Sequence, residues 1–456
     1  MSGFDVVVVG GGPGGYVAAL RAAREGLKVA LVEEREVGGT CLHLGCIPTK
    51  ALHRTAFYLQ CFKHFERNGI SAELKDFSLA AAVARKEGIV KKLTAGIHYL
   101  LKKNGVAFYR GKGTVVDRGE VEVVGSGGSE RLKAQSVIIA TGSAPQKPPG
   151  FPFDGETVLT SDEALSLKEL PRSLAVVGGG VIGCELAGIF HAFGCRVTVI
   201  ELQDGLLPAM DEDVGKALGA AFRKRGIEVK LKARVAGVEK TGRGALVELD
   251  SGEVLEVEKV LVAVGRRYLS REVARPELNL ALGPRGEIAT DERTRTSVPG
   301  IYAVGDVTGK RELAHVAAHQ GVVAALNAAG YEAREELQVV PAAVFTFPEA
   351  AGVGLTERDL LAQGVRTFKF PFSALGKAVT MDETEGFVKV VADTGGVVRG
   401  VHIVGPHAAD LVATAALLVK AGFKAGEAER LIFAHPTLPE ALKEALEGIE
   451  GTCLHL

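Results

Sequence analysis

The sequence predicts an α/β fold with two parallel-sheet domains and a C-terminal α+β interface domain. One observation is a strand, glycine-rich turn, helix and second strand near the amino terminus, a pattern that returns from residue 174. Another is the pair of strand patterns at 386–391 and 397–404, which lie among Ala-rich helical segments. A length of 456 residues suits about three domains.

The first unit begins with an apolar strand at 4–9 and continues through the turn 10–15 into a helix from Tyr16 to about Glu25. Glycines at the G-x-G-x-x-G positions allow a tight turn, close approach to a pyrophosphate and close helix packing. A second strand at 28–32 leads to Glu33, whose carboxylate suits a ribose hydroxyl. We therefore expect a dinucleotide site formed by Gly10, Gly12, Pro13, Gly14, Gly15 and Glu33.

The second unit has a strand at 174–177, a helix ending near Phe193 and a strand at 196–200. Its glycines are Gly178, Gly180 and Gly183, and its acid is Glu201. Gly10 precedes Glu33 by 23 residues, as Gly178 precedes Glu201, so we expect two bound dinucleotides. Glu201 favours NAD over NADP, because a carboxylate repels a 2′-phosphate.

Cys41 and Cys46 follow the acidic end of the first unit within the segment 38–50. The amino terminus lacks the pattern of a secretory signal, so we expect a cytoplasmic protein, in which a close cysteine pair is more often catalytic or metal-binding than structural. Four intervening residues do not match the common zinc spacing, and we expect no metal site. A flavin exchanges electrons with a thiolate, whereas a nicotinamide ordinarily does not, so we expect FAD at the first unit and NAD at the second.

His435 and Glu440 lie near the carboxyl end, separated by a segment with two prolines that predicts a turn into a helix. Only a thiolate attacks a disulfide, so oxidation of a dithiol needs a base. Histidine can hold a proton near neutral pH, and a neighbouring carboxylate orients its ring. The alternative for a single histidine is a structural role.

Composition excludes two classes of partner. The net charge is −1, with 24% charged and 47% hydrophobic residues, which does not indicate a nucleic-acid surface. Apolar runs such as 411–418 are too short to span a bilayer, so we expect no membrane segment.

These motifs, together with the segments 140–143, 296–306, 313–315 and 435–440, resemble those of disulfide-dependent flavoprotein reductases over nearly the whole chain. Among these reductases the chain is most similar to the dihydrolipoamide dehydrogenase branch, which oxidises lipoyl groups with NAD⁺. The resemblance implies that Cys46 is the charge-transfer thiol beside the flavin and that Cys41 exchanges with substrate. It implies that Lys50 lies near flavin N5 and that Asp306 binds the ribitol or pyrophosphate side of FAD. Further cofactor contacts implied by the resemblance are Gly39, Thr40, Gly113, Thr141, Gly142, Ser143, Glu312, Leu313, Ala314 and His315 for FAD, and Ile182, Glu185, Val235 and Gly265 for NAD.

The resemblance also implies partners. The family takes its histidine base from the second subunit, so we expect a homodimer with His435 and Glu440 acting across it. Phe433 stands where most relatives have a second histidine, which leaves His435 as the candidate base of its segment. Other expected partners are the lipoyl and subunit-binding domains of a 2-oxo acid dehydrogenase acyltransferase, or the lipoyl protein of a glycine cleavage system.

The expected domains are an FAD domain at 1–144, an NAD domain at 145–267, a central FAD-side segment at 268–337 and a dimerisation domain at 338–456. A glutathione reductase would have an Arg-rich NADP site at Glu201. Mercuric reductases and high-molecular-weight thioredoxin reductases have a cysteine pair in the tail, where this chain has Cys453 alone. A non-catalytic flavoprotein subunit is the alternative outside the enzymes.

A six-residue repeat has no chemical explanation at the level of sequence. The residues Gly-Thr-Cys-Leu-His-Leu occur at 39–44 and again at 451–456. Chain ends are commonly poorly ordered, so we expect the second copy to be a mobile tail. The alternative is a tail thiol that engages the active site.

Overall fold

The computed structural model describes residues 3–62 and 64–456. The described residues form two compact units, the first holding residues up to Leu52 with 80–146 and 265–337. The second unit holds 53–79, 147–264 and 338–456. Each unit is described separately below, and the four-domain division remains a prediction.

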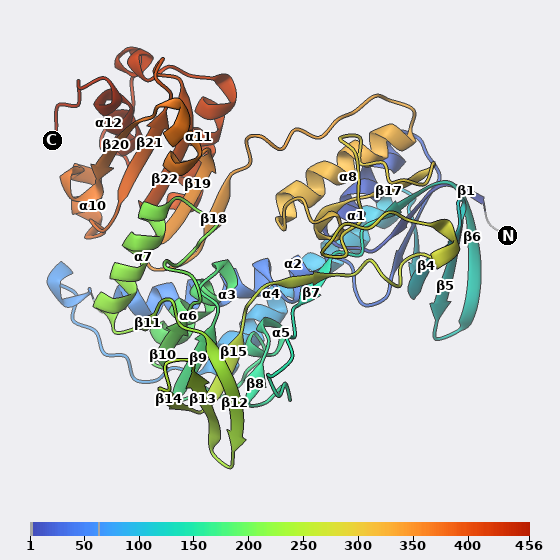
Figure 1. Ribbon diagram of the computed structural model, residues 1–456, viewed down its shortest axis with the longest axis horizontal. Coiled ribbons are helices and arrows are strands. Elements are labelled where there is room, and N and C mark those ends of the chain that lie inside the picture. Colours follow the sequence, from blue (N-terminus) through green and yellow to red (C-terminus); the bar gives the residue numbers. More distant parts are fainter. Residues whose placement is uncertain (1–2, 63) are drawn as a thin grey trace. The chain divides into compact units, whose positions relative to one another are not determined.

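A seven-stranded sheet forms the centre of the first unit, with the strand order β3-β2-β1-β6-β5-β4 and β17 beside β6 (Figure 1). The strands β1, β2, β3 and β17 run parallel to their neighbours, whereas β4, β5 and β6 are antiparallel to one another. Their bounds are β1 Gly3–Val9, β2 Val29–Glu33, β3 Ala107–Arg110, β4 Lys112–Asp117, β5 Glu120–Gly125, β6 Gly128–Ile139 and β17 Ile301–Ala303.

The valines of β1 are buried on both faces of this sheet, as expected for a parallel strand covered on two sides. Val6 and Val8 join a core with α1 (Pro13–Arg24) and α8 (Ala314–Ala328). Val7 and Val9 join a second core with strands β4 and β5. The alternation fixes the register of β1, so that the strand's end places the glycine turn at the sheet's carboxyl edge.

The other helices and short strands of residues 39–103, 143–145 and 266–308 lie outside the seven-stranded sheet. Helix α3 begins in the first unit and continues into the second, and α4 follows it. The bounds are α2 Gly39–His43, α3 Cys46–Phe62, η1 Glu66–Asn68, α4 Leu79–Lys103, β7 Ser143–Pro145, β16 Arg266–Tyr268, η2 Pro276–Leu278 and η3 Gly305–Thr308.

The second unit contains a five-stranded parallel sheet with the order β11-β10-β9-β15-β8. A three-stranded antiparallel sheet, β12-β13-β14, packs its apolar side chains into the same core. The bounds are β8 Val158–Leu159, α5 Ser161–Ala164, β9 Ser173–Val177, α6 Val181–Phe193, β10 Arg196–Ile200, α7 Glu212–Arg225, β11 Glu228–Lys230, β12 Val235–Thr241, β13 Gly244–Leu249, β14 Val254–Val257 and β15 Lys259–Val262.

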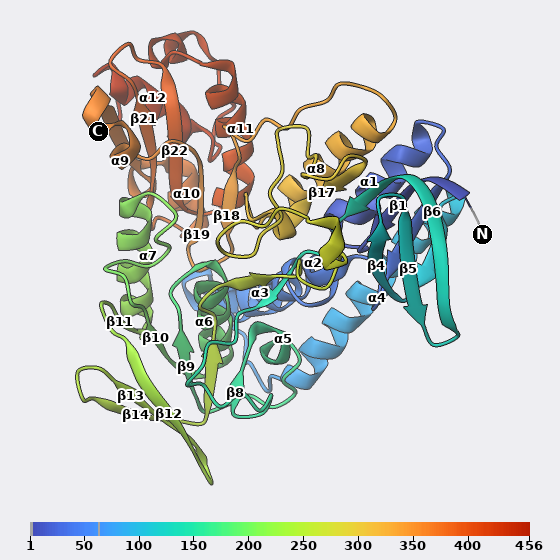
Figure 2. The same ribbon diagram turned by 45° about the vertical axis from the view of Figure 1, so that its right-hand side comes forward.

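The C-terminal part of the second unit is an antiparallel sheet, β18-β19-β22-β21-β20, whose strands lie beside the helices α11 and α12 (Figure 2). This α+β arrangement confirms the expected fold class. The bounds are β18 Ala342–Val344, β19 Glu349–Gly354, α9 Glu357–Leu360, η4 Leu361–Gln363, β20 Arg366–Pro371, η5 Phe372–Ala374, α10 Gly376–Met381, β21 Phe387–Ala392, β22 Val398–Gly405, α11 Ala408–Ala421, η6 Ala425–Arg430 and α12 Glu440–Ile449.

The segment 296–306, one of the motifs of the resemblance, contains the strand β17 and the turn η3. Thr296 forms a turn, because its backbone N–H and its hydroxyl both donate to the Ile301 carbonyl, the hydroxyl at 2.9 Å. Asp306 therefore lies in η3, just beyond the carboxyl end of β17.

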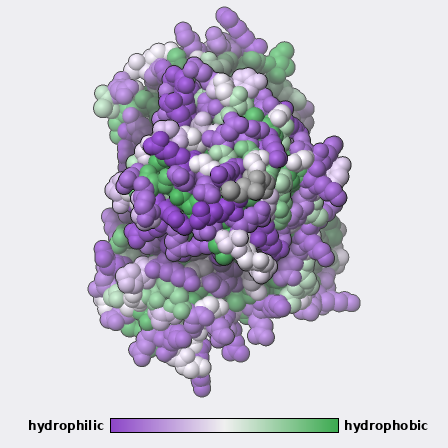
Figure 3. Space-filling model, turned by 90° about the vertical axis from the view of Figure 1, so that its right-hand side faces the viewer, coloured by the Kyte–Doolittle hydropathy of each residue, from purple (hydrophilic) through white to green (hydrophobic). Residues whose placement is uncertain are grey.

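The molecular surface is mixed in character. On the face drawn in Figure 3, hydrophilic side chains predominate and hydrophobic ones occur in small separate groups. Among the described residues, none of the helices combines the length and the apolar character needed to cross a membrane.

Candidate active site

The first glycine turn is shaped by steric limits at its ends and by open space at its middle. A side chain at Gly10 would collide with the Ala140 carbonyl, and one at Gly15 would collide with the Gly10 carbonyl. At Gly12 the nearest neighbouring atom would be 3.9 Å away, and no side chain caps the amino end of α1. Because the helix dipole and free N–H groups attract anions, this hollow suits a pyrophosphate.

The carboxylate of Glu33 is held in a fixed orientation beside this turn. One oxygen accepts the Gly11 N–H at 2.6 Å, and the other accepts the Arg35 N–H at 2.8 Å. Each carboxylate oxygen has a second acceptor position, so the group can still bind a ribose hydroxyl.

The segment with the two cysteines rests directly on the glycine turn. The Gly38 N–H donates to the Gly11 carbonyl at 2.8 Å, and a side chain at Gly39 would come within 2.6 Å of the Gly12 Cα. Cys41 lies in α2, and Cys46 begins α3 with Lys50 one turn further on. The short gap between turn and helix fixes where the thiols stand relative to the first nucleotide fold.

Cys41 and Cys46 are not joined by a disulfide in this structure, and the pKa of Cys41 is strongly shifted. A hydrogen bond to Cys46, together with burial, raises the pKa of Cys41 far above its ordinary value. Lys50 opposes this shift and Asp306 adds to it, so both charged groups act on the pair. The raised pKa favours the protonated form of Cys41.

Asp306 belongs to a polar cluster that includes a residue missed by sequence reasoning. The Ser143 hydroxyl donates to Asp306 at 2.5 Å, and Arg266 Nε donates to the Ser143 hydroxyl at 2.7 Å. Arg266 also lies 3.8 Å from the Asp306 carboxylate and donates to the Ser143 carbonyl at 2.9 Å. The only sequence signal for Arg266 was its position directly after Gly265. Its partner Ser143 is 123 residues away, so the pairing could not be read from local sequence.

Other predicted FAD contacts also lie in the first unit. Thr141 donates its hydroxyl to the Leu269 carbonyl at 2.7 Å, and Glu312 accepts the Tyr268 hydroxyl at 3.1 Å. A side chain at Gly113, on β4, would come within 2.9 Å of Val9 and 3.1 Å of Val32, which is a structural reason for a glycine there. Thr40, Gly142, Leu313, Ala314 and His315 lie in α2, the β6–β7 connection and the start of α8.

The second glycine turn repeats the geometry of the first. Side chains at Gly178 and Gly183 would collide with the Ala263 and Gly178 carbonyls, whereas one at Gly180 would meet nothing within 4 Å. The buried Glu201 accepts the Gly179 N–H at 2.5 Å and the Gln203 N–H at 2.7 Å. The two turns therefore present the same open middle glycine and the same fixed carboxylate.

The remaining NAD candidates have different surroundings in the second unit. Glu185 is buried in α6 and accepts the Phe345 N–H at 2.9 Å. Val235 begins β12 and packs against the core of the parallel sheet. Ile182 lies in the first turn of α6. Gly265 belongs to the first unit, and a side chain added there would meet no atom within 4 Å.

His435 and Glu440 form the ion pair that the sequence predicted. The His435 Nδ1 lies 2.8 Å from Glu440, whose other oxygen accepts the Thr437 N–H at 2.5 Å. Burial opposes ionisation of Glu440, but the Thr437 N–H and His435 hold its pKa below the usual range. The imidazole is 78% exposed, so Nε2 is the nitrogen left to exchange protons. The His435–Pro436 peptide bond is cis.

The C-terminal tail is not loose as expected, because it is attached to α12. The Cys453 thiol donates to Glu444 at 3.1 Å, and the His455 ring contacts the other oxygen of the same carboxylate at 2.7 Å. Burial and the bond to Glu444 raise the pKa of Cys453, which makes it a poor nucleophile near neutral pH. The contacts of Cys453 and His455 with Glu444, nine and eleven residues earlier, thus hold the tail that we expected to be mobile.

Comparison with known proteins gives the family. A model described as "Pyridine nucleotide-disulphide oxidoreductase" matches residues 4–321, and the model of that family's dimerisation domain matches 340–446. The chain belongs to the pyridine nucleotide-disulphide oxidoreductase family. Members of this family use FAD and NAD, and the chain is accordingly an oxidoreductase with these two cofactors, as the resemblance implied.

Within this oxidoreductase family the similarity extends over whole chains. Dihydrolipoyl dehydrogenases of Thermus scotoductus and Chlamydia muridarum are 43% and 41% identical, and each comparison covers at least 98% of both chains. The crystal structure of LpdA from Mycobacterium tuberculosis superposes with a TM-score of 0.91 at 30% identity, covering 98% of this chain and all of that one. An HOCl-induced flavoprotein disulfide reductase, RclA from Escherichia coli, gives 0.87 at 26% identity, covering 97% and 99%.

Proposed function

We propose that this oxidoreductase oxidises protein-bound dihydrolipoyl groups at Cys41 and Cys46 and reduces NAD⁺ to NADH. The observation that carries the proposal is the thiol pair itself, hydrogen-bonded and seated on the first glycine turn. The full-length relatives named dihydrolipoyl dehydrogenase support the choice of substrate.

The residues present suit one cofactor at each glycine turn. FAD would be held by the turn at Gly12, by Glu33 and by Asp306, with Lys50 near its reactive ring. Bound there, FAD supplies a relay for two electrons between the dithiol and NAD⁺. NAD would be held by the turn at Gly180 and by Glu201, with Glu185 near its nicotinamide end.

The chain's own residues perform the sulfur chemistry. In the oxidised enzyme, a thiolate of the substrate attacks the Cys41 sulfur, the Cys41–Cys46 bond breaks, and Cys46 receives the electron pair. The second substrate thiol then attacks the sulfur bonded to Cys41, releasing the lipoyl disulfide and leaving Cys41 as a thiol. His435 takes a proton from the attacking dithiol at Nε2, and Glu440 stabilises the imidazolium. The net change is dihydrolipoyl plus NAD⁺ to lipoyl plus NADH and a proton.

A homodimer completes the proposed site. The match to the family's dimerisation domain supports a dimer, in which His435 and Glu440 of each subunit serve the thiols of the other. The proposed partners are the lipoyl and subunit-binding domains of a 2-oxo acid dehydrogenase acyltransferase, or the lipoyl protein of a glycine cleavage system. The proposed domain plan assigns 1–144 and 268–337 to FAD, 145–267 to NAD and 338–456 to the dimer.

Initial velocities test the proposed reaction. With dihydrolipoamide and NAD⁺ varied together, we expect parallel double-reciprocal lines, because the two substrates react in separate half-reactions. Glutathione disulfide and Hg²⁺ with NADPH serve as comparison substrates for the glutathione and mercuric reductase alternatives. Faster turnover of either comparison substrate, or no turnover with dihydrolipoamide, would refute the assignment.

Glu201 gives a prediction about nucleotide choice. We expect kcat/KM for NAD⁺ to exceed that for NADP⁺ at least ~100-fold, because like charges placed together cost several kcal/mol. Glu201→Ala should narrow this ratio about tenfold or more, whereas Glu256→Ala, an exposed acid on β14, should leave it unchanged. Steady-state kinetics with both nucleotides measure the ratio, and a wild-type preference for NADP⁺ would contradict the role of Glu201.

Ile432 gives a prediction about the dimer. Its side chain is 99% exposed three residues before His435, which is unusual for a large apolar residue unless a partner covers it. We expect Ile432→Asp to weaken the dimer and to reduce dihydrolipoamide oxidation in parallel. Val254→Asp, at a 54% exposed position on β14, is the matched control. Sedimentation velocity measures the dimer, and an unchanged dimer in Ile432→Asp would exclude this side chain from the interface.

A further inference from the structure

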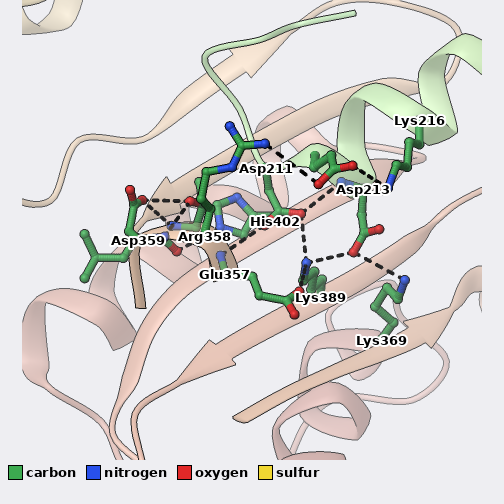
Figure 4. A network of polar contacts seen from close by, with 12 residues as sticks. Asp211, Asp213, Lys216, Glu357, Arg358, Asp359, Lys369, Lys389 and His402 are labelled. Atoms are coloured by element: carbon green, nitrogen blue, oxygen red, sulfur yellow. Dashed lines mark hydrogen bonds and ion pairs between the residues drawn. The ribbon is translucent and has the colours of Figure 1, made fainter. Parts of the chain in front are cut away.

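A buried lysine links two segments of the second unit that are far apart in sequence. Lys389 lies on β21 with 2% of its side chain exposed, and its ammonium contacts three carboxylates (Figure 4). The distances are 2.9 Å to Asp211, 2.7 Å to Asp213 and 2.7 Å to Glu357. Asp211 and Asp213 belong to the segment after the second glycine fold, whereas Lys389 and Glu357 belong to the C-terminal domain.

The cluster keeps its charges despite burial. Burial alone would lower the pKa of Lys389, but its three carboxylate partners raise it above the usual range. Removing one partner of such a buried pair leaves the other charges uncompensated, so the contacts hold the segments firmly together. Lys369 adds a more exposed contact, 3.3 Å from Asp213, with half of its side chain in solvent.

Asp211 connects Lys389 to the start of α7. Its side chain caps that helix by accepting the Asp213 N–H at 3.1 Å, and it also accepts the Glu357 N–H at 3.2 Å. Asp211 ends an irregular loop, 202–210, which begins directly after Glu201. The position of Asp211 therefore fixes the end of that loop.

The same loop contacts the second glycine turn. The Leu207 N–H donates to the Gly179 carbonyl at 2.9 Å, and a side chain at Gly179 would come within 2.6 Å of Leu206. Leu207 is buried with φ 51, a conformation that favours glycine and that the surrounding contacts must hold in a leucine. Contacts therefore run without interruption from Lys389 through Asp211 and the loop to the turn.

We propose that Lys389 is a positioning residue for NAD⁺, which acts by holding the loop 202–210 against the second glycine turn. The inference rests on the proposed placement of NAD at that turn. In this proposal Lys389 does not contact the nucleotide. From its buried position on β21 it fixes the conformation of the loop 202–210 beside the nucleotide site. The dithiol half-reaction uses Cys41, Cys46 and His435, none of which lies in this loop, so it should not depend on the loop.

The main test is Lys389→Met, which keeps the length of the side chain and removes its charge. We expect the Kd for NAD⁺, measured by calorimetry, and the KM for NAD⁺ to rise roughly 2- to 30-fold, the range for substitutions that act through a packed network. Hydrogen–deuterium exchange in peptides covering 202–210 should increase. The rate of anaerobic reduction by dihydrolipoamide should stay unchanged.

Two further variants control for charge and folding. Lys369→Met removes the exposed lysine of the same cluster and should leave the Kd within about twofold of wild type. Lys389→Met with Asp211→Asn reduces the uncompensated charge, so it remains testable if the single variant does not fold, and it should show the same weaker NAD⁺ binding.

Gly180→Ala separates failure of this inference from failure of the proposed function. Its backbone suits any residue and a Cβ there meets no protein atom, so the added methyl disturbs only a nucleotide bound at the turn. If Gly180→Ala leaves the Kd for NAD⁺ unchanged, the placement of NAD is wrong. If Gly180→Ala weakens binding but both Lys389 variants bind normally and keep the loop protected, the positioning role is refuted.

Discussion

Cys46→Ser should lose more than about 10³-fold of its dihydrolipoamide turnover, as expected when half of a covalent catalytic pair is removed. Reduction by dihydrolipoamide without oxygen should also fail to produce a long-wavelength thiolate-to-flavin absorbance. The reason is the proposed placement of Cys46 beside the flavin, while the hydrogen bond within the pair raises the pKa of Cys41 and favours its protonated form. Anaerobic titration in a spectrophotometer measures both effects on the purified flavoprotein.

Two cysteine variants control this experiment. Cys41→Ser removes the substrate-facing thiol, so turnover should fall equally while the long-wavelength band persists at Cys46. Cys453 has the same two preceding and three following residues as Cys41. Cys453→Ser should nevertheless leave both the turnover and the long-wavelength band unchanged. A band that survives in Cys46→Ser and disappears in Cys41→Ser would reverse the roles of the two sulfurs.

His435→Gln should lower dihydrolipoamide oxidation about 10²- to 10⁴-fold, the usual contribution of a general base. The ring's Nδ1 is engaged by Glu440, so the variant loses proton transfer at Nε2. Reduction of an artificial electron acceptor by NADH needs no dithiol and should continue at the wild-type rate. Stopped-flow reduction by each substrate separates the two half-reactions.

The chain provides a matched control for His435 in a second histidine whose carboxylate partner also lies on α12. His455 contacts Glu444 at 2.7 Å, one turn of α12 beyond Glu440, and its ring is similarly exposed. His455→Gln therefore removes the same kind of ion pair and should leave dihydrolipoamide oxidation unchanged. Equal losses in both variants would indicate that helix α12, rather than a specific base, accounts for the effect.

Glu440→Gln should lower the same rate by a smaller factor, and the loss should be present throughout the neutral range because the carboxylate is ionised above about pH 5. The pKa of Glu440 is lower in the folded protein, so its stabilising contribution is present above the ordinary carboxyl pKa and is lost only as the pH falls through the lowered value. Glu440 is thus ionised throughout the neutral range. A Glu440→Gln variant with the wild-type kcat/KM at neutral pH would contradict this role of Glu440.

The sequence predicted the two nucleotide folds well because their signals are local. The steric limits at Gly10 and Gly178 act within a single turn. The acidic residue of each unit ends the adjoining strand, so its distance from the glycines in sequence is enough to place its carboxylate beside the turn. The ion pair of His435 with Glu440 was predictable for the same reason, since only five residues separate them.

The missed contacts that matter most for the site are long-range. Arg266 meets Ser143 across 123 residues, and Lys389 meets Asp211 across 178. A lysine within a strand normally indicates a solvent-facing position, and only the fold brings three carboxylates around this one.

The two copies of Gly-Thr-Cys-Leu-His-Leu separate local sequence from chemical environment. The first copy supplies the helical turn α2, and the second lies in irregular backbone beside α12. Intrinsic preference is identical in both, so neighbouring segments alone decide the conformation and the reactivity of the thiol. Short peptides with this sequence, or reagents selected against them, would not distinguish a substrate-facing thiol from an inert one; only the assembled protein makes that distinction.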